Sequence, residues 1–193
     1  GKEICGVLSL AATKEHSHVG LICFSDQNEL YLRPLKGSLQ AYEIITALAR
    51  LQPASKKTNL KKAVSFAVNI IKRKSVIILI SDFIDGENYY QDLKALAKRH
   101  DLVMIQISDK RETQLPKLGI IPVQDKESGK TLWVNTSFGD FREKVSHQVH
   151  TKTKELADFS RKHQINLISL DTQEDYVPQL LKLFKIRNRA MKV

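Results

Sequence analysis

The sequence predicts an α/β fold in which helices cover both faces of a mostly parallel sheet. Four short apolar runs show no alternation with polar residues, which is typical of strands buried on both faces. Amphipathic stretches with helical spacing separate these runs along the chain. Because strands that alternate with helices are joined by right-handed crossovers, we expect the four runs to lie parallel. The runs are His18–Ser25, Ser75–Ile80, Leu102–Ile107 and Ile165–Leu170.

The first third of the chain predicts three helices and a strand pair. Residues 1–16 form an amphipathic stretch that favours a helix, and the strand at 18–25 follows it. Residues 29–35 alternate between apolar and polar side chains and contain Pro34, which indicates an edge strand returning from a turn. Ser38 can cap a helix over 39–51, and the next apolar stripe predicts a helix over 59–73.

The remaining elements follow from the same patterns. A helix is predicted over 89–100, between the strands at 75–80 and 102–107. Two extended pieces, 119–124 and 131–135, flank the polar stretch DKESGK and predict a hairpin. A long helix over 140–163 leads to the last strand, and Pro178 can occupy the first turn of a helix to about 190.

Composition bounds the class of protein. The 193 residues suit one domain, and the 42% of hydrophobic residues is typical of a soluble globular protein. No apolar run approaches the roughly 20 residues that span a bilayer. The two cysteines, Cys5 and Cys23, fall in a predicted helix and a predicted buried strand, so we expect reduced thiols and a cytoplasmic protein.

Motifs for common enzyme chemistry are absent from the sequence. No Gly-x-Gly-x-x-Gly follows a strand, and neither a Gly-Lys-Ser/Thr loop nor a Gly-x-Ser-x-Gly elbow occurs. His147 and His150 have metal-compatible spacing, but no third ligand accompanies them. We therefore expect a binding module and not an enzyme.

Polar residues end each of the four apolar runs. Ligands of open parallel sheets bind at the carboxyl ends of the strands, where Asp82 follows the run VIILI. Thr58 precedes the helix that leads into this strand, so its loop is expected at the same end of the sheet. Carboxylate and hydroxyl oxygens suit Mg²⁺. Asp26, Asp109 and Asp171 are better explained as strand terminators, and Asp82 itself could cap the following segment.

The chain resembles a von Willebrand factor A-type domain. More closely, it is similar to a bacterial family of uncharacterised proteins, domain of unknown function fifty-eight, often encoded beside MoxR-type AAA ATPases. The stretches HVGLICFSD, KKTNL and SVIILISDFID carry the resemblance, together with the hairpin stretch around LPKLGIIPVQDKESGKTLWVNTS. It implies a three-layer, Rossmann-like fold for a single domain over residues 1–193, with a hairpin insertion at about 119–135.

The resemblance also implies a metal-ion-dependent adhesion site. In such domains an Asp-x-Ser-x-Ser motif, a Thr and a second Asp hold Mg²⁺. Thr58 and Asp82 match the last two, and Ser81 would be a donor behind them. The Asp-x-Ser-x-Ser motif does not occur at the matching place. Either the chain is an N-terminally truncated domain that begins after the motif, or the protein lacks the motif. In both cases we expect Mg²⁺ binding to be weak or absent.

The same comparison implies that the first, central strand of the sheet is missing. That strand would lie between the strands at 19–24 and 76–80, and its loss would leave unpaired backbone groups on both. Three outcomes are expected as alternatives: the two strands close up, a neighbouring chain supplies a strand, or the chain forms a swapped or paired dimer.

The expected function is protein binding at the carboxyl edge of the sheet. A partner carboxylate would complete the coordination of Mg²⁺, and the partner would be a MoxR-type ATPase or its client in protein maturation or assembly. The family also implies membrane helices upstream, and hence membrane association through a region that this chain lacks.

Two alternatives stay open at this point. The net charge of +10 would suit nucleic acid or an acidic surface, although no aromatic residues interleave with the basic ones. A metal-dependent hydrolase would need a second carboxylate near Asp82. The basic candidates are Lys56, Lys57, Lys61, Lys62, Lys72, Arg73 and Lys74, and the acidic candidates are Asp85, Glu87 and Asp109.

Overall fold

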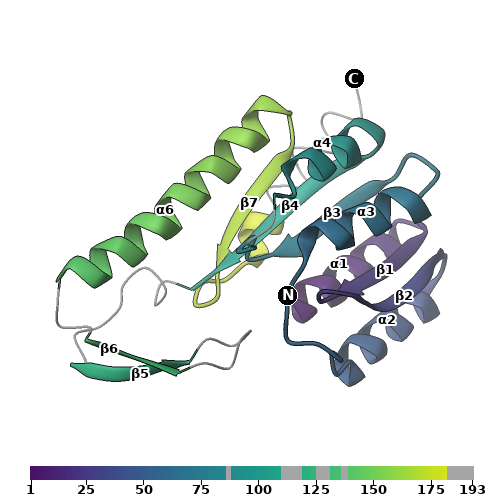
Figure 1. The fold of residues 1–193 in the computed structure, drawn as a ribbon. Coiled ribbons are helices and arrows are strands. Elements are labelled where there is room, and N and C mark those ends of the chain that lie inside the picture. Colours follow the sequence, from purple (N-terminus) through teal and green to yellow (C-terminus); the bar gives the residue numbers. More distant parts are fainter. Residues whose placement is uncertain (86–87, 110–118, 125–130, 136–138, 182–193) are drawn as a thin grey trace. The chain divides into compact units, whose positions relative to one another are not determined.

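The structure, a computed structural model, describes residues 1–85, 88–109, 119–124, 131–135 and 139–181 (Figure 1). The chain divides into two compact units. The first unit comprises Gly1–Lys74 and Asp85–Arg99. The second comprises Ser75–Ile84 and the described residues from His100 onward. The expected single-domain organisation over 1–193 stays a prediction.

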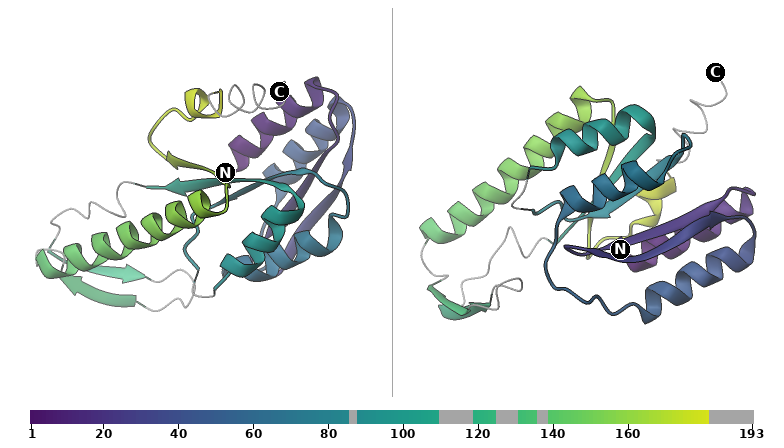
Figure 2. Two further views of the ribbon diagram at one scale, coloured as in Figure 1. Left: turned by 90° about the horizontal axis from the view of Figure 1, so that it is seen from above. Right: turned by 45° about the vertical axis from the view of Figure 1, so that its right-hand side comes forward.

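The first unit is built on an antiparallel hairpin and four helices. In chain order its elements are α1 (Lys2–Lys14), β1 (Val19–Phe24), β2 (Asn28–Leu35), α2 (Ser38–Arg50), α3 (Leu60–Ile70) and α4 (Tyr90–Arg99). α1 and α2 pack against each other, and both contact β1 (Figure 2). A Cβ on Gly6 of α1 would lie 3.3 Å from Ile45 Cγ1 of α2. α3 packs against α4, where Ser65 Oγ donates to Asp92 Oδ1 at 3.1 Å.

The apolar stripes that predict these helices form the core of the first unit. Ile44 of α2, Leu60 of α3 and Leu93 of α4 are each fully buried. Two ends differ from the sequence prediction. Gly37, with φ at 95°, takes the N-cap position of α2 instead of Ser38, which is already helical. α3 ends at Ile70 and not at Arg73, because Ile71 is extended (ψ 100°) at the start of the connection to the next strand.

A bulge in the hairpin depends on a glycine. The register shifts between Val19 and Leu21, so that Gly20 faces β2 closely. A Cβ at Gly20 would lie 2.8 Å from the backbone oxygen of Leu32 and 3.0 Å from Pro34. Only glycine allows this approach of the two backbones.

The second unit contains a three-stranded parallel sheet and a separate hairpin. Its elements are β3 (Val76–Ser81), β4 (Asp101–Ser108), β5 (Ile120–Gln124), β6 (Thr131–Asn135), α6 (Gly139–Lys162) and β7 (Asn166–Asp171). The sheet has the order β3-β4-β7, with both neighbours parallel to β4 (Figure 1). α6 contacts β7, and β5 pairs antiparallel with β6. Residues 177–181 are helical, whereas the rest of the predicted closing helix lies outside the described residues.

Strand β4 forms the centre of this unit. Residues Leu102 to Ile105 of β4 are between 0% and 3% exposed, because β4 has a strand on each side. The equally apolar Ile77–Ile80 of β3 are only half-buried. β3 pairs with one strand only among the described residues, which leaves its second edge without a ladder there.

The structure confirms an α/β fold with parallel apolar strands, in a smaller sheet than the sequence predicts. In the described part of the chain, β1 pairs with β2 and with no strand of the β3-β4-β7 sheet. The closing up of β1 and β3 stays a prediction. Residues 2–14 are helical, and no strand occurs within 1–17. Strand supply by a neighbouring chain and dimer formation stay predictions. The hairpin at 119–135 is confirmed by the pairing of β5 with β6.

Gly20→Ala is expected to destabilise the first unit. The new methyl group would meet the Leu32 oxygen at 2.8 Å, so β1 or β2 must shift. Overpacking of this kind costs about 1–3 kcal/mol. Urea denaturation of the variant and of the wild-type chain measures the change. Lys36→Ala, at the exposed end of β2, serves as the control and is expected to stay within about 0.5 kcal/mol. Equal stability of Gly20→Ala and wild type would contradict the tight approach.

Cys23 is expected to be a poor nucleophile in the folded chain. Both cysteines are free thiols. Burial, with a smaller contribution from Cys5, raises the pKa of Cys23 from 9.0 to about 11. At pH 8 the folded chain should therefore hold about 100-fold less Cys23 thiolate than the unfolded chain. Alkylation at pH 8, followed by peptide mass spectrometry in the presence and absence of urea, measures the ratio. The folded rate should rise only as the pH approaches 11, and equal rates at pH 8 would contradict this environment.

Candidate functional site

The turn that follows β3 holds Asp82 at the carboxyl edge of the parallel sheet. Phe83 adopts a left-handed conformation, with φ at 58°, and its side chain is only 4% exposed. A buried aromatic residue with positive φ is a genuine outlier, found where surrounding contacts enforce it. Ser81 Oγ accepts the Phe83 amide at 3.1 Å. The chain therefore turns sharply after Asp82 and leaves its carboxylate exposed.

Of the two carboxylate oxygens of Asp82, only Oδ1 accepts hydrogen bonds from described residues. Asp82 Oδ1 accepts the Ile84 amide at 3.1 Å and lies 3.4 Å from the Ser81 hydroxyl. The structure records no hydrogen bond from a described residue to Oδ2. Because no helix starts here, Asp82 shapes a turn and does not cap a helix. An exposed, charged oxygen with no internal partner is the kind of ligand that a hard cation takes.

Thr58 lies in the segment of residues 51–59 between α2 and α3, hereafter the Thr58 loop. Asn59 caps α3, because its Oδ1 accepts the Lys62 amide at 2.9 Å. The Asn59 amide donates to the Ser25 carbonyl oxygen at 3.1 Å, and the Lys57 amide donates to Ser55 Oγ at 3.2 Å. Thr58 itself is half-buried, and no hydrogen bond of its hydroxyl to a described residue is found.

The predicted ligands lie in different units. Ser81 and Asp82 belong to the second unit, and the Ser81 hydroxyl lies 3.4 Å from Asp82 Oδ1. Thr58 belongs to the first unit. That Thr58 and Asp82 lie close enough to share one cation therefore stays a prediction.

Asp85 stabilises the N-terminus of α3. Its Oδ2 accepts the amide of Leu60, the first helical residue of α3, at 2.6 Å. A carboxylate at a helix N-terminus is stabilising, because it binds a free amide and opposes the positive end of the helix dipole. Glu87 lies outside the described residues, and Asp109 follows β4. Among the described residues, no group of three or more His, Cys, Asp or Glu side chains could hold a metal ion.

The other strand ends form turns, as their residue types predict. Asp171 Oδ1 accepts the Gln173 amide at 2.8 Å at the end of β7. The carbonyl oxygen of Ser108 accepts the Thr172 amide at 2.9 Å. At the end of β1, a hydrogen bond from the Ser55 side chain lowers the pKa of Asp26, with Lys62 and Lys57 nearby adding to the effect.

The sequence analysis did not predict a row of three polar side chains near the carboxyl edge of the β3-β4-β7 sheet. Ser81, Gln106 and Ser169 are register partners on β3, β4 and β7, so their side chains share one face of the sheet. Ser169 Oγ donates to Gln106 Oε1 at 3.1 Å, and Gln106 is 8% exposed. The signal in the sequence is the single glutamine within the apolar run LVMIQI.

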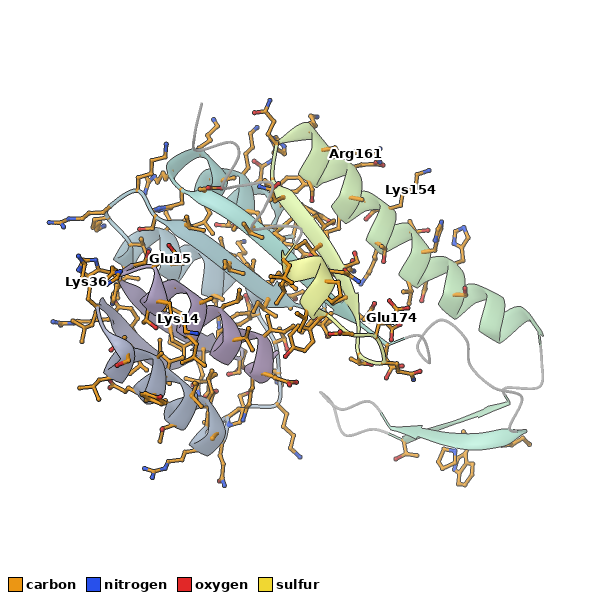
Figure 3. The ribbon with its side chains drawn as sticks, turned by 180° about the vertical axis from the view of Figure 1, so that it is seen from behind. Lys14, Glu15, Lys36, Lys154, Arg161 and Glu174 are labelled. Atoms are coloured by element: carbon orange, nitrogen blue, oxygen red, sulfur yellow. The ribbon has the colours of Figure 1, made fainter. Side chains whose placement is uncertain are left out.

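Basic residues are distributed over the surface. The seven basic candidates at 56–57, 61–62 and 72–74 are all exposed. Other basic side chains point outward elsewhere, among them Lys154 and Arg161 on α6 (Figure 3). Arg161 is 76% exposed and pairs with Asp158 within its own helix. Exposed pairs of this kind contribute little to stability. Part of the positive charge is therefore an ordinary solvated surface.

Several relatives of the chain are uncharacterised proteins from mycobacteria. The chain is 27% identical over 119 residues to uncharacterized protein MAV169 of Mycobacterium avium, a match that covers 62% of this chain and 70% of that protein. It is 26% identical over 138 residues to uncharacterized protein Rv1480 of Mycobacterium tuberculosis, covering 72% of this chain but only 43% of that protein.

Two solved structures share the fold. The conserved hypothetical protein BatB from Bacteroides thetaiotaomicron superposes with a TM-score of 0.59 at 13% identity, covering 98% of this chain and 88% of that one. An aerotolerance-related membrane protein from Bacteroides fragilis gives 0.53 at 13% identity, covering 89% and 81%. In the described part of this chain, no helix has the length and apolar character needed to cross a membrane.

One protein family accounts for most of the chain. The family described as "Protein of unknown function DUF58" matches residues 2–155, a span that includes the Thr58 loop, Ser81 and Asp82. The chain therefore belongs to the DUF58 family.

Proposed function

We propose that this chain is a protein-binding module of von Willebrand A type. Its partner docks at the carboxyl edge of the β3-β4-β7 sheet, where a divalent cation links Asp82 to a carboxylate of the partner. The observation that carries the proposal is the turn after β3. There a buried Phe83 with φ at 58° holds the Asp82 carboxylate exposed at the sheet edge.

The available oxygen atoms suit Mg²⁺. Asp82 offers a charged oxygen and Thr58 a hydroxyl, and Mg²⁺ needs few protein ligands because it retains several waters. Ser81 supports the site by contacting Asp82 Oδ1 at 3.4 Å. With one carboxylate, binding of the free ion by this chain is weak.

The partner that we propose is a MoxR-type ATPase or a client of that ATPase. Residues at KKTNL and SVIILISDFID support the von Willebrand A assignment, and family membership supports the DUF58 part of it. The expected membrane association belongs to the same proposal. One of the two similar solved structures is that of a membrane protein, by its own description.

Cation binding is expected to depend on Asp82. Calorimetric titration of the chain with Mn²⁺ should show weak binding, and Asp82→Asn should raise the Kd about tenfold or more, because the charge is lost while the Ile84 turn is kept. Thr58→Val should raise it about 2- to 10-fold. Asp175→Asn is the matched control, since Asp175 Oδ1 accepts the Val177 amide at 2.9 Å in a similar turn. No binding, or an equal effect of Asp175→Asn, would contradict the cation site.

Partner binding is expected to need the same carboxylate. Interferometry with a purified MoxR-type ATPase from the same genome should show Mg²⁺-dependent binding that EDTA and Asp82→Asn each weaken about tenfold or more. The charge-reversal pair Lys56→Glu and Lys61→Glu tests the alternative of an acidic-surface binder, because both lysines are exposed. Binding that survives EDTA and Asp82→Asn but disappears in the lysine pair and at high salt would favour that alternative.

A further inference from the structure

A network of hydrogen bonds joins the end of the β1–β2 hairpin to the Thr58 loop. Glu29, the second residue of β2, is at its centre. Glu29 Oε2 accepts the Ala54 amide at 3.0 Å, and Oε1 accepts the Ser55 amide at 3.4 Å. Ser25 Oγ donates to the same Oε1. One carboxylate therefore binds two consecutive amides of the loop, about 25 residues away in sequence.

The hairpin also holds the far end of the loop. The Ser25 carbonyl oxygen accepts the Asn59 amide at 3.1 Å, directly after Thr58. The carbonyl oxygen of Asp26 accepts from Lys62 Nζ at 3.4 Å. Thr58 thus lies between two anchored points, at residues 54–55 and at residue 59, both attached to the same hairpin turn.

The Thr58 loop depends on these hydrogen bonds because it belongs to no helix or strand. Residues 51–59 form neither helix nor strand. Fixing a segment without regular structure costs backbone entropy at every residue, and contacts must offset that cost. Hydrogen bonds to a carboxylate are stronger than neutral ones. The bonds from Ser25 and then from Ala54 lower the pKa of Glu29, which agrees with a carboxylate that is charged in this network.

We infer that Glu29 is a positioning residue that fixes the Thr58 loop, and thereby sets the affinity of the site to which Thr58 contributes. The consequence for affinity rests on the proposed function, whereas the fixing of the loop does not. Glu29 touches no ligand in this scheme. It acts through the loop backbone, as a binding site requires its ligands to be held before the cation arrives.

Two variants of Glu29 distinguish the effect of its side-chain length from the effect of its charge. Glu29→Gln keeps the side-chain length, but it replaces one acceptor oxygen by an NH₂ group that faces an amide donor. Glu29→Asp keeps the charge and is one methylene short of both amides. Glu43→Gln is the matched control, because Glu43 is an exposed glutamate of α2 in the same unit.

The experiment measures the loop and the affinity separately. In both Glu29 variants, amide hydrogen exchange at Ala54 and Ser55 should be about tenfold faster or more, while the amides of α1 and α2 keep their protection. The NMR order parameter of the Thr58 methyl group should fall. The Kd for Mn²⁺ should rise at least about threefold, with little change in melting temperature. The Glu43→Gln chain should behave as wild type in every readout.

The outcomes distinguish this inference from the proposed function. An unchanged loop and an unchanged Thr58 methyl group in both variants would overturn the role of Glu29. A loosened loop with unchanged Mn²⁺ affinity would overturn it as a positioning residue for the site. If the wild-type chain takes up no Mn²⁺, the cation site is wrong. In that case hydrogen exchange at Ala54 and Ser55, together with the order parameter of the Thr58 methyl group, decides whether Glu29 fixes the loop.

Discussion

Backbone amides in loops and in the first turn of a helix have no partner in a helix or sheet ladder, and in this chain side-chain oxygens accept several of them. Glu29 accepts two amides of the Thr58 loop, Asn59 accepts that of Lys62, and Asp85 accepts that of Leu60. Asp82 does the same for Ile84 in the turn after β3. Each of these acceptors lies near the end of a helix or strand. The loops that carry the candidate ligands are therefore ordered by the same type of bond.

Parallel pairing on both sides of β4 is the second determinant of the structure. It buries β4 almost completely and brings the ends of three strands to one edge. The polar row of Ser81, Gln106 and Ser169 lies just beneath that edge, and the left-handed Phe83 directs the chain away from it. Asp82 is exposed for this reason, although it follows directly on a strand of half-buried apolar residues.

The edges of the two sheets relate to the expected missing strand. β1 and β3 are both continuous apolar runs, yet each pairs with one strand only among the described residues. Their residues are half-buried, in contrast to those of β4. Apolar strands of this kind are typical of sheet interiors, and exposed edges favour association with a further strand. The proposed module would use the carboxyl edge of the β3-β4-β7 sheet for its partner.

The sequence by itself determined the class of the fold and most of its elements, because hydrophobic periodicity depends only on neighbouring residues. The strands at 76–81 and 101–108, the hairpin of β5 and β6, and the helix start at Asn59 all follow from local patterns. The sequence also indicated Asp82, because a Ser-Asp pair after an apolar run is visible in the sequence alone. The tertiary structure alone decided that Glu29 binds a loop about 25 residues away, that Gly20 lies against the Leu32 oxygen, and that β1 pairs antiparallel with β2. These features depend on which distant backbone groups need a partner or approach closely, and no local pattern records that.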